Sequence, residues 1–246
     1  MIAVEDLGVE FFFDRHLRVC TPREARLRGK SSTFWGLRDL TFSMRSGEGA
    51  ALIGPSGSGK TTLLRVLAGV FAPDRGTVVV RGRVASLLSV DAGLLGLLTG
   101  RENALLLGVI AGLSRRAVLR RMGAIKERSA LEDAFEKPVL TYSQGMRARL
   151  GLAVAEEVDP QILLLDEVHE ALDHEFRAVL QLRAKTIIEG GGIVVAAGHD
   201  HPMLERFCSR ALWLEQGRIR ADGSFDEVQP RYVAAAEGRG ASQEIG

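Results

Sequence analysis

A glycine-rich stretch, GPSGSGKTT at residues 54–62, combines residue types that bind phosphate. Its glycines permit a turn whose backbone amides point at phosphate oxygens, its lysine can reach the β and γ phosphates, and the next threonine can ligate Mg²⁺. A short apolar run, AALI, precedes the stretch, and a segment with helical spacing, TTLLRVLAGV, follows from its last residues. This strand, turn and helix order predicts a nucleotide-binding P-loop at a helix N-terminus. Its residues are Gly54, Pro55, Ser56, Gly57, Ser58, Gly59, Lys60, Thr61 and Thr62.

A pair of carboxylates ends a second apolar run, QILLLDEV, about a hundred residues further along the chain. Such a run is typical of a central parallel strand whose carboxyl end opens onto a ligand site. We expect Asp166 to hold Mg²⁺ together with Thr61, and Glu167 to polarise the attacking water. A P-loop with such a pair describes kinases, GTPases, helicases and transport ATPases alike.

A third stretch, TYSQGMR at residues 141–147, separates these classes. The segment after it predicts a helix that ends at Asp159-Pro160. Ser143 can cap that helix, and the adjacent amides with Gly145 can bind an anion at its positive end. Together with the other two sites, the stretch resembles the signature motif of ABC ATPases. The resemblance implies that the serine and the glycine touch the γ-phosphate bound on the P-loop of a second chain. The motif residues are Tyr142, Ser143, Gln144, Gly145 and Met146.

Two further elements of ABC ATPases follow along the chain in the order that the family has. In EALDHEF, Asp173 occupies the position of the D-loop aspartate, which helps to join the two active sites of a dimer. In GGIVVAAGHD, His199 follows a predicted strand and matches the switch histidine that contacts the γ-phosphate. The resemblance therefore makes Glu167, His199 and Lys60 the catalytic candidates, with ATP and Mg²⁺ as cofactors. We expect His201 to be a solvated side chain.

Longer stretches resemble one branch of this family, the ATP-binding subunits of polysaccharide exporters. They are LTGRENALL, YSQGMRARLGLAVA and FWGLRDLTF, which begin at residues 98, 142 and 34. The resemblance implies an ATPase that drives export of a lipid-linked glycan, such as O-antigen, teichoic acid, capsule or cell-wall glycan. It also implies a homodimer bound to a polytopic permease at the cytoplasmic face of the cell membrane. An ATPase of a drug or lipid exporter, a non-transport ABC ATPase and a small-molecule kinase are the alternatives.

The chain departs from the family pattern between the P-loop and the signature motif. Members normally carry a glutamine there that senses Mg²⁺ and couples to the membrane subunit, but no glutamine occurs between Thr61 and Ser143. The aligned position is Ser89, and Asp91 is the nearest acid. Ion sensing or coupling is therefore expected to differ.

The N-terminal segment raises two further expectations. The resemblance asks for an aromatic residue upstream of the P-loop that stacks on adenine, and we favour Phe11 within the Phe11–Phe13 group, although Phe34 and Trp35 are also candidates. By the same resemblance, the polar insertion between residues 14 and 33 carries a helix near the membrane subunit. An exposed basic loop is the alternative.

Composition agrees with a globular α/β protein. Hydrophobic residues make up 46% of the 246 residues, and 32 Lys and Arg nearly balance 31 Asp and Glu, so net charge does not suggest nucleic-acid binding. No apolar run reaches the roughly 18 to 20 residues of a membrane helix. We expect a P-loop NTPase core of ABC ATPase type over residues 1–235, with a small antiparallel β subdomain and an inserted helical subdomain at roughly 88–158. Residues 236–246 are expected to form a loose tail.

Overall fold

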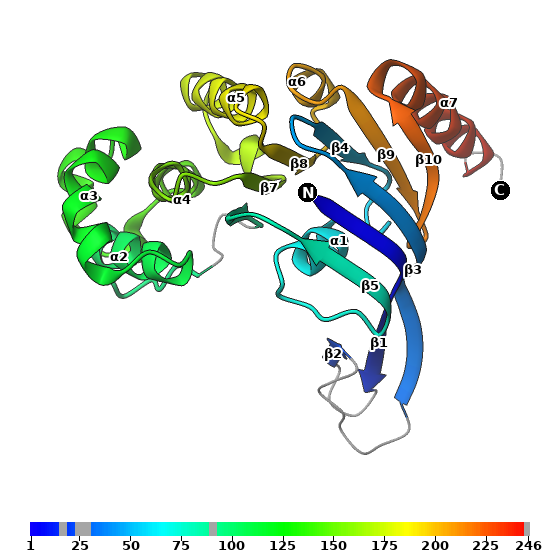
Figure 1. Ribbon diagram of the computed structural model, residues 1–246, viewed down its shortest axis with the longest axis horizontal. Helices are drawn as coiled ribbons and strands as arrows, with labels where there is room; N and C mark the ends of the chain where they lie inside the picture. Colours follow the sequence, from blue (N-terminus) through cyan, green and yellow to red (C-terminus); the bar gives the residue numbers. More distant parts are fainter. Residues whose placement is uncertain (15–18, 23–30, 89–92, 244–246) are drawn as a thin grey trace.

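The computed structural model describes residues 1–14, 19–22, 31–88 and 93–243, and its strands form two sheets (Figure 1). Ser89 and Asp91 lie outside these ranges, as does most of the polar insertion, of which residues 19–22 form a strand. The larger sheet has the strand order β10-β9-β4-β8-β7-β6. Its members are β4 (Gly49–Ile53), β6 (Val84–Leu87), β7 (Ile162–Asp166), β8 (Ile193–Ala197), β9 (Arg210–Glu215) and β10 (Arg218–Ser224).

The larger sheet is parallel except at one edge, where β10 pairs antiparallel with β9. The central strands β4, β7 and β8 are buried at every residue, as expected for strands covered on both faces. Their register places Leu52 beside Ala197 and Ala197 beside Asp166. The segments that leave these three strands therefore emerge at one edge of the sheet.

The smaller sheet is antiparallel and consists of β1 (Ile2–Asp14), β2 (Val19–Pro22), β3 (Ser31–Met44) and β5 (Arg75–Val80). Strand β1 is central, because it pairs with β3 on one side and with β5 and β2 on the other. Bulges interrupt its pairing with β3 between Val4 and Glu10. The antiparallel subdomain predicted from the sequence is present.

Two hydrophobic clusters cover the two faces of the larger sheet, because side chains alternate along each strand. Ala51, Leu163 and Val194 face a cluster that includes residues of α4 (Gln144–Glu157), α5 (His174–Glu189) and α6 (His201–Glu205). The other face packs against α1 (Lys60–Leu67) and the antiparallel sheet.

The helices between β6 and β7 have a hydrophobic cluster of their own, centred on residues such as Phe135 and Leu150. They are α2 (Gly100–Ile110), α3 (Arg115–Ser129), the short 3₁₀ helices η2 (Glu132–Glu136) and η3 (Val139–Thr141), and α4. Side-chain caps begin the three α-helices among them, since Thr99 forms a capping box with Glu102 before α2, Ser114 caps α3 and Ser143 caps α4. Helices α2 and α3 lie at one end of the molecule (Figure 1), where the sequence predicted a helical subdomain.

The C-terminal segment differs from the loose tail expected at residues 236–246, because α7 (Phe225–Gln243) continues through most of it. Alanines at 234–236 favour a helix, and Tyr232 and Ala235 pack against the core, so the helix is anchored before it reaches the polar residues. The hairpin of β9 and β10 that precedes α7 agrees with the sequence analysis.

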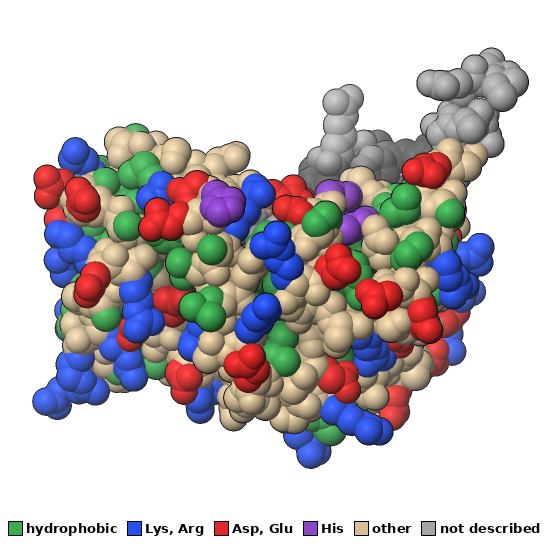
Figure 2. Space-filling view, turned by 90° about the horizontal axis from the view of Figure 1, so that it is seen from above, with side chains coloured by type: hydrophobic (Ala, Val, Ile, Leu, Met, Phe, Trp, Pro, Cys, Tyr) green, Lys and Arg blue, Asp and Glu red, His purple; other side chains and the backbone are tan. Residues whose placement is uncertain are grey.

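The face of the molecule seen in Figure 2 carries charges of both signs, as the balanced composition leads one to expect. Among the described residues, no helix combines the length and the apolar character that crossing a bilayer requires.

Candidate active site

The glycine-rich stretch forms a turn between β4 and α1. Gly54, Gly57 and Gly59 all have positive φ, at 146°, 75° and 108°, which explains the need for glycine. Gly54 has no room for a side chain either, because a Cβ there would lie 2.1 Å from the Leu214 carbonyl oxygen. Lys60 begins α1, and its Nζ donates to the carbonyl oxygens of Gly54 at 2.8 Å and Pro55 at 3.2 Å. The ammonium group thus lies over the turn, where the P-loop prediction requires it.

Charged side chains surround this lysine. Burial lowers the pKa of Lys60, while the carboxylates of Glu167, Asp166 and Glu170 oppose that shift. Burial raises the pKa of Asp166, which is only 7% exposed, and a hydrogen bond with Thr61 opposes that rise. Asp166 Oδ1 has no hydrogen-bond partner among the described residues. A buried carboxylate oxygen without a partner, beside a threonine hydroxyl, fits an oxygen-ligated cation such as Mg²⁺.

A cavity of about 390 Å³ opens at this turn. It is lined by Phe11, Phe34, Gly36, residues 56–62 and Glu167. The rings of Phe11 and Phe34 stack with centroids 5.6 Å apart and an interplanar angle of 22°. Of the aromatic candidates, these two share the cavity with the P-loop, while the Phe13 side chain lies outside the described part. The cavity therefore has a phosphate-binding wall and an aromatic wall.

Glu167 lines this cavity and lies next to His199, although the two residues follow different strands. Glu167 Oε1 lies 3.4 Å from His199 Nε2. The Glu167 backbone has a φ of 57°, which is unusual for a residue with a side chain, and its N–H donates to the Ala197 carbonyl oxygen at 2.9 Å. The last rung between β7 and β8 thus places the acid beside the segment that carries the histidine.

The next histidine, His201, is not the solvated side chain expected from the sequence. Its ring packs edge-on against Tyr232 at 5.5 Å, and its Nδ1 lies 3.5 Å from Gln229 Nε2. Burial lowers the pKa of His201. The helix that covers it, α7, extends past the segment that the sequence analysis regarded as structured.

The signature residues lie at the N-terminus of α4, outside the set that lines the cavity. Ser143 caps the helix as predicted, and its Oγ accepts the Met146 N–H at 3.2 Å. Ser143 and Gln144 are exposed. Tyr142 differs from the other motif residues, because its ring is 5% exposed and its hydroxyl donates to the Ala134 carbonyl oxygen at 2.6 Å. Its side chain therefore belongs to the core of the helical subdomain.

Asp173 connects the signature helix to α5. Its Oδ1 caps α5 by accepting the Phe176 N–H at 3.0 Å, and its Oδ2 lies 3.3 Å from Arg149 Nη2. The Arg149 guanidinium also lies over the Phe176 ring, 4.8 Å from its centroid. Gly145 is close as well, since a Cβ there would be 3.2 Å from the Ala171 carbonyl oxygen. The sequence analysis assigned no role to Arg149, which lies in the helix that Ser143 caps.

The family model described as "ABC transporter" matches residues 37–170. The chain belongs to the ABC transporter family. The matched segment is the ATPase domain of that family, so this chain is an ABC ATPase, which binds and hydrolyses ATP.

Several curated ABC relatives are similar over most of this chain. The O-antigen export system ATP-binding protein RfbB of Klebsiella pneumoniae is 37% identical over 214 residues, which is 87% of each chain. RfbB of Myxococcus xanthus is 35% identical and covers 88% of this chain, which corresponds to 51% of that protein. The teichoic acids export ATP-binding protein TagH of Listeria monocytogenes is 34% identical over 82% of this chain and 60% of its own length.

Solved structures confirm the fold predicted from the sequence. The dimeric, post-hydrolysis ATP-binding cassette MJ0796 bound to ADP and Pi has a TM-score of 0.73 at 22% identity, and the match covers 92% of this chain and 99% of that one. A structure of an ATP-binding subunit of an ABC transporter has a TM-score of 0.71 at 24% identity, with 94% and 93% covered.

Proposed function

We propose that this ABC ATPase drives export of a lipid-linked polysaccharide across the cytoplasmic membrane. The observation that carries the proposal is the 37% identity, over 87% of both chains, to an O-antigen export ATP-binding protein. Teichoic acid export proteins among the relatives extend the glycan class to cell-wall polymers. In this proposal the chain lies at the cytoplasmic face of the membrane, bound to a polytopic permease.

The P-loop is proposed to hold the phosphates of ATP. Backbone N–H groups of the turn, which Pro55 lacks, would donate to phosphate oxygens, and Lys60 would exchange its contacts with the Gly54 and Pro55 carbonyl oxygens for phosphate oxygens. Thr61 and Asp166 would hold Mg²⁺. When bound, this ion would neutralise the negative charge that develops on the phosphates. The Phe11 ring would stack on the adenine, since it forms the opposite wall of the cavity.

Hydrolysis is assigned to Glu167 and His199. The Glu167 carboxylate is partly exposed at the cavity, so it can accept a hydrogen bond from the attacking water and orient it. His199, 3.4 Å away, can donate a hydrogen bond to the γ-phosphate while its ring stays next to that carboxylate. Lys60 stabilises the negative charge on the transferred phosphate.

A second copy of the chain completes each site in this proposal. The signature residues do not line the cavity of their own chain, and Ser143, Gln144 and Gly145 present a capped helix N-terminus that suits a phosphate. In a head-to-tail dimer they would contact ATP on the P-loop of the other chain, with Met146 next to them. Asp173 would join the two sites from α5. ATP binding then closes the dimer, and hydrolysis releases it.

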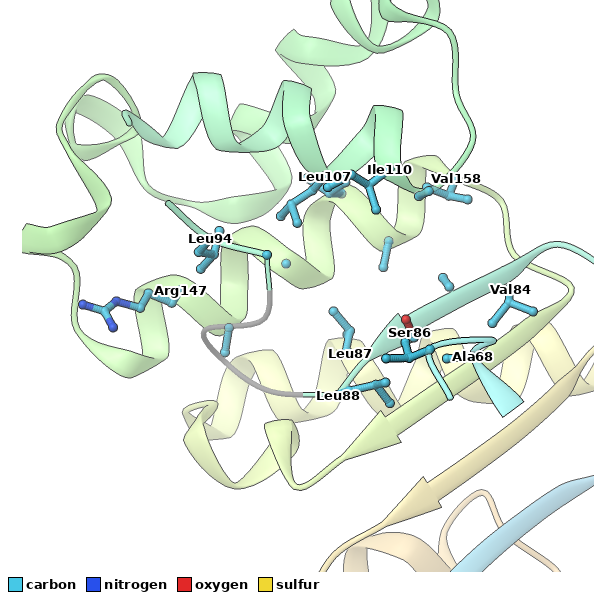
Figure 3. A pocket seen from close by; sticks show the side chains of 18 residues that line it. Ala68, Val84, Ser86, Leu87, Leu88, Leu94, Leu107, Ile110, Arg147 and Val158 are labelled. Atoms are coloured by element: carbon cyan, nitrogen blue, oxygen red, sulfur yellow. The ribbon is translucent and has the colours of Figure 1, made fainter. Parts of the chain in front are cut away.

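The permease is proposed to dock where the helical subdomain meets the sheet. A mostly apolar cavity of about 350 Å³ lies there, between β6 on one side and α2 and α4 on the other. Figure 3 shows Leu107 and Ile110 facing the segment that carries Leu87 and Leu88 across this space. Movement of the helical subdomain would change the width of the cavity, which links ATP binding to the membrane partner.

Affinity purification tests the proposed function. The tagged chain is recovered from detergent-solubilised native membranes, and the co-purifying proteins are identified by mass spectrometry. The expected result is a polytopic membrane protein encoded beside glycosyltransferases. Recovery of soluble partners alone, or of a permease encoded with drug-resistance genes, would overturn the assignment to glycan export and leave the ATPase assignment intact.

A further inference from the structure

Glu170 is an acidic side chain at the active site to which no sequence motif assigned a role. It lies on η4 (Val168–Ala171), and its backbone N–H donates to the Glu167 carbonyl oxygen at 2.9 Å. Its carboxylate Oε1 accepts the backbone N–H of His199 at 2.9 Å. The Arg177 side chain donates to its carbonyl oxygen at 3.1 Å. Glu170 therefore connects the end of β7 to the segment after β8.

The segment that carries His199 depends on this contact. Regular pairing between β7 and β8 ends at Asp166 and Ala197, so the ladder does not hold the histidine. On its far side, Asp200 caps α6 by accepting the Met203 N–H at 3.1 Å. Between these two anchors, the His199 N–H donates to the Glu170 carboxylate. The backbone position at His199 is thus set by a side chain from another element.

The charge of Glu170 extends to the P-loop. Its carboxylate, like those of Glu167 and Asp166, favours the charged form of Lys60. Glu170 is therefore one of three carboxylates whose charge acts on the lysine. Glutamine would form the same hydrogen bond to His199 without this charge, so an acceptor role and a charge role can be separated experimentally.

We propose that Glu170 is a positioning residue for ATP hydrolysis, whose carboxylate oxygen fixes the His199 backbone so that the imidazole faces Glu167. This inference rests on the proposed roles of Glu167 and His199. Glu170 acts through the histidine, and its acceptor oxygen matters more than its charge.

The first experiment compares Glu170→Ala with Glu170→Gln in the full chain. Steady-state ATP hydrolysis gives kcat and KM, and a fluorescent ATP analogue gives the dissociation constant. We expect kcat to fall about ten-fold in the alanine variant, because the histidine loses its fixed position, with nucleotide affinity within about two-fold of wild type. The glutamine variant should keep kcat within about two-fold. Glu189→Ala, at the exposed end of α5, is the matched control and should change neither quantity.

A double-mutant cycle with His199→Ala tests whether Glu170 acts through the histidine. If it does, Glu170→Ala lowers kcat about ten-fold in the wild-type background and by less than about two-fold when His199 is already absent. Equal effects in both backgrounds, wild-type turnover of Glu170→Ala, or a glutamine variant as slow as the alanine variant would each overturn the proposal. Glu167→Gln separates this failure from failure of the proposed function, since normal turnover in that variant would remove the catalytic assignment itself.

Discussion

We expect Asp166→Asn to raise the free energy of unfolding when no ligand is present. With Mg²⁺ and ATP bound, the same variant should be less stable than wild type. The carboxylate is 7% exposed and its Oδ1 has no partner among the described residues. A buried polar atom without a partner costs about 1–3 kcal/mol, and more when it is charged, so a neutral amide of the same shape lowers this cost. Part of this cost is offset by the hydrogen bond with Thr61 and by the positive charges of Arg65 and Lys60. We therefore expect a net gain of about 1 kcal/mol in the free energy of unfolding.

Ligands should reverse that order. Mg²⁺ and ATP at a hundred times the dissociation constant stabilise the wild-type chain by about 2.7 kcal/mol. If the asparagine variant binds them about a hundred-fold more weakly, it gains only about 0.4 kcal/mol under the same conditions. Wild type would then be the more stable chain by about 1.3 kcal/mol, which follows from 2.7 less 0.4 and less the 1 gained by the variant.

Thermal unfolding followed by fluorescence measures both states, first with EDTA and no nucleotide and then with Mg²⁺ and ATP. For a chain of this size, about 1 kcal/mol corresponds to a Tm change of roughly 2–4 °C. Asp133→Asn replaces an exposed acid and should leave Tm unchanged in both states. A variant that is less stable than wild type in EDTA would refute the reasoning, because it would show that the buried carboxylate is already satisfied.

The pH dependence has a definite sign. Burial raises the pKa of Asp166 in the folded chain above its unfolded value. At pH values between the unfolded and the folded pKa, the folded state therefore binds more protons than the unfolded state. The contribution of this group to stability is therefore present at low pH and is lost as the pH rises through the folded pKa. The advantage of the asparagine variant in EDTA should shrink as the pH is lowered from neutral.

Other predictions concern neighbouring residues. Glu167→Gln should bind ATP but lower kcat by about 10²–10³, and it should accumulate as a dimer in light scattering with ATP; normal turnover would exclude Glu167 as the residue that activates the attacking water. Phe11→Ala should raise the dissociation constant for ATP about ten-fold in a fluorescence titration and leave that for inorganic phosphate unchanged, since only stacking is lost. Asp173→Ala should lower the free energy of unfolding in urea by about 1–2 kcal/mol, because both the helix cap and the pair with Arg149 are lost, whereas Asp173→Asn keeps the cap and should cost about 0.5 kcal/mol. Equal losses in the two variants would show that the cap contributes nothing.

Local motifs made the P-loop predictable from the sequence. Residues 54–60 adopt positive φ at glycines and begin a helix at the lysine, both of which are properties of short-range backbone geometry. The cap at Ser143 is equally local. The proximity of Glu167 to the strand that leads to His199 could be predicted from the apolar runs before these two residues. Parallel strands align their carboxyl ends at one edge of a sheet.

Contacts between distant segments were not predictable in the same way. Glu170 and Arg149 act on residues far along the chain, and no periodicity encodes which acid meets which backbone amide. The burial of Tyr142 and His201 depends on how a helical subdomain and a terminal helix pack, rather than on the residues beside them. The end of α7 was misjudged because a small, polar composition suits both a loose tail and a helix that is anchored upstream.

The contact between Arg149 and Asp173 has a consequence for the kinetics of a dimer. It ties the helix whose N-terminus would face the partner's ATP to the element that would join the two sites. A change at one nucleotide would then alter the affinity for the other, because α4 and the start of α5, which would contact the two sites, are joined by this ion pair. Hydrolysis should therefore rise with ATP concentration more steeply than a hyperbola, and breaking the contact should return the curve towards independent sites.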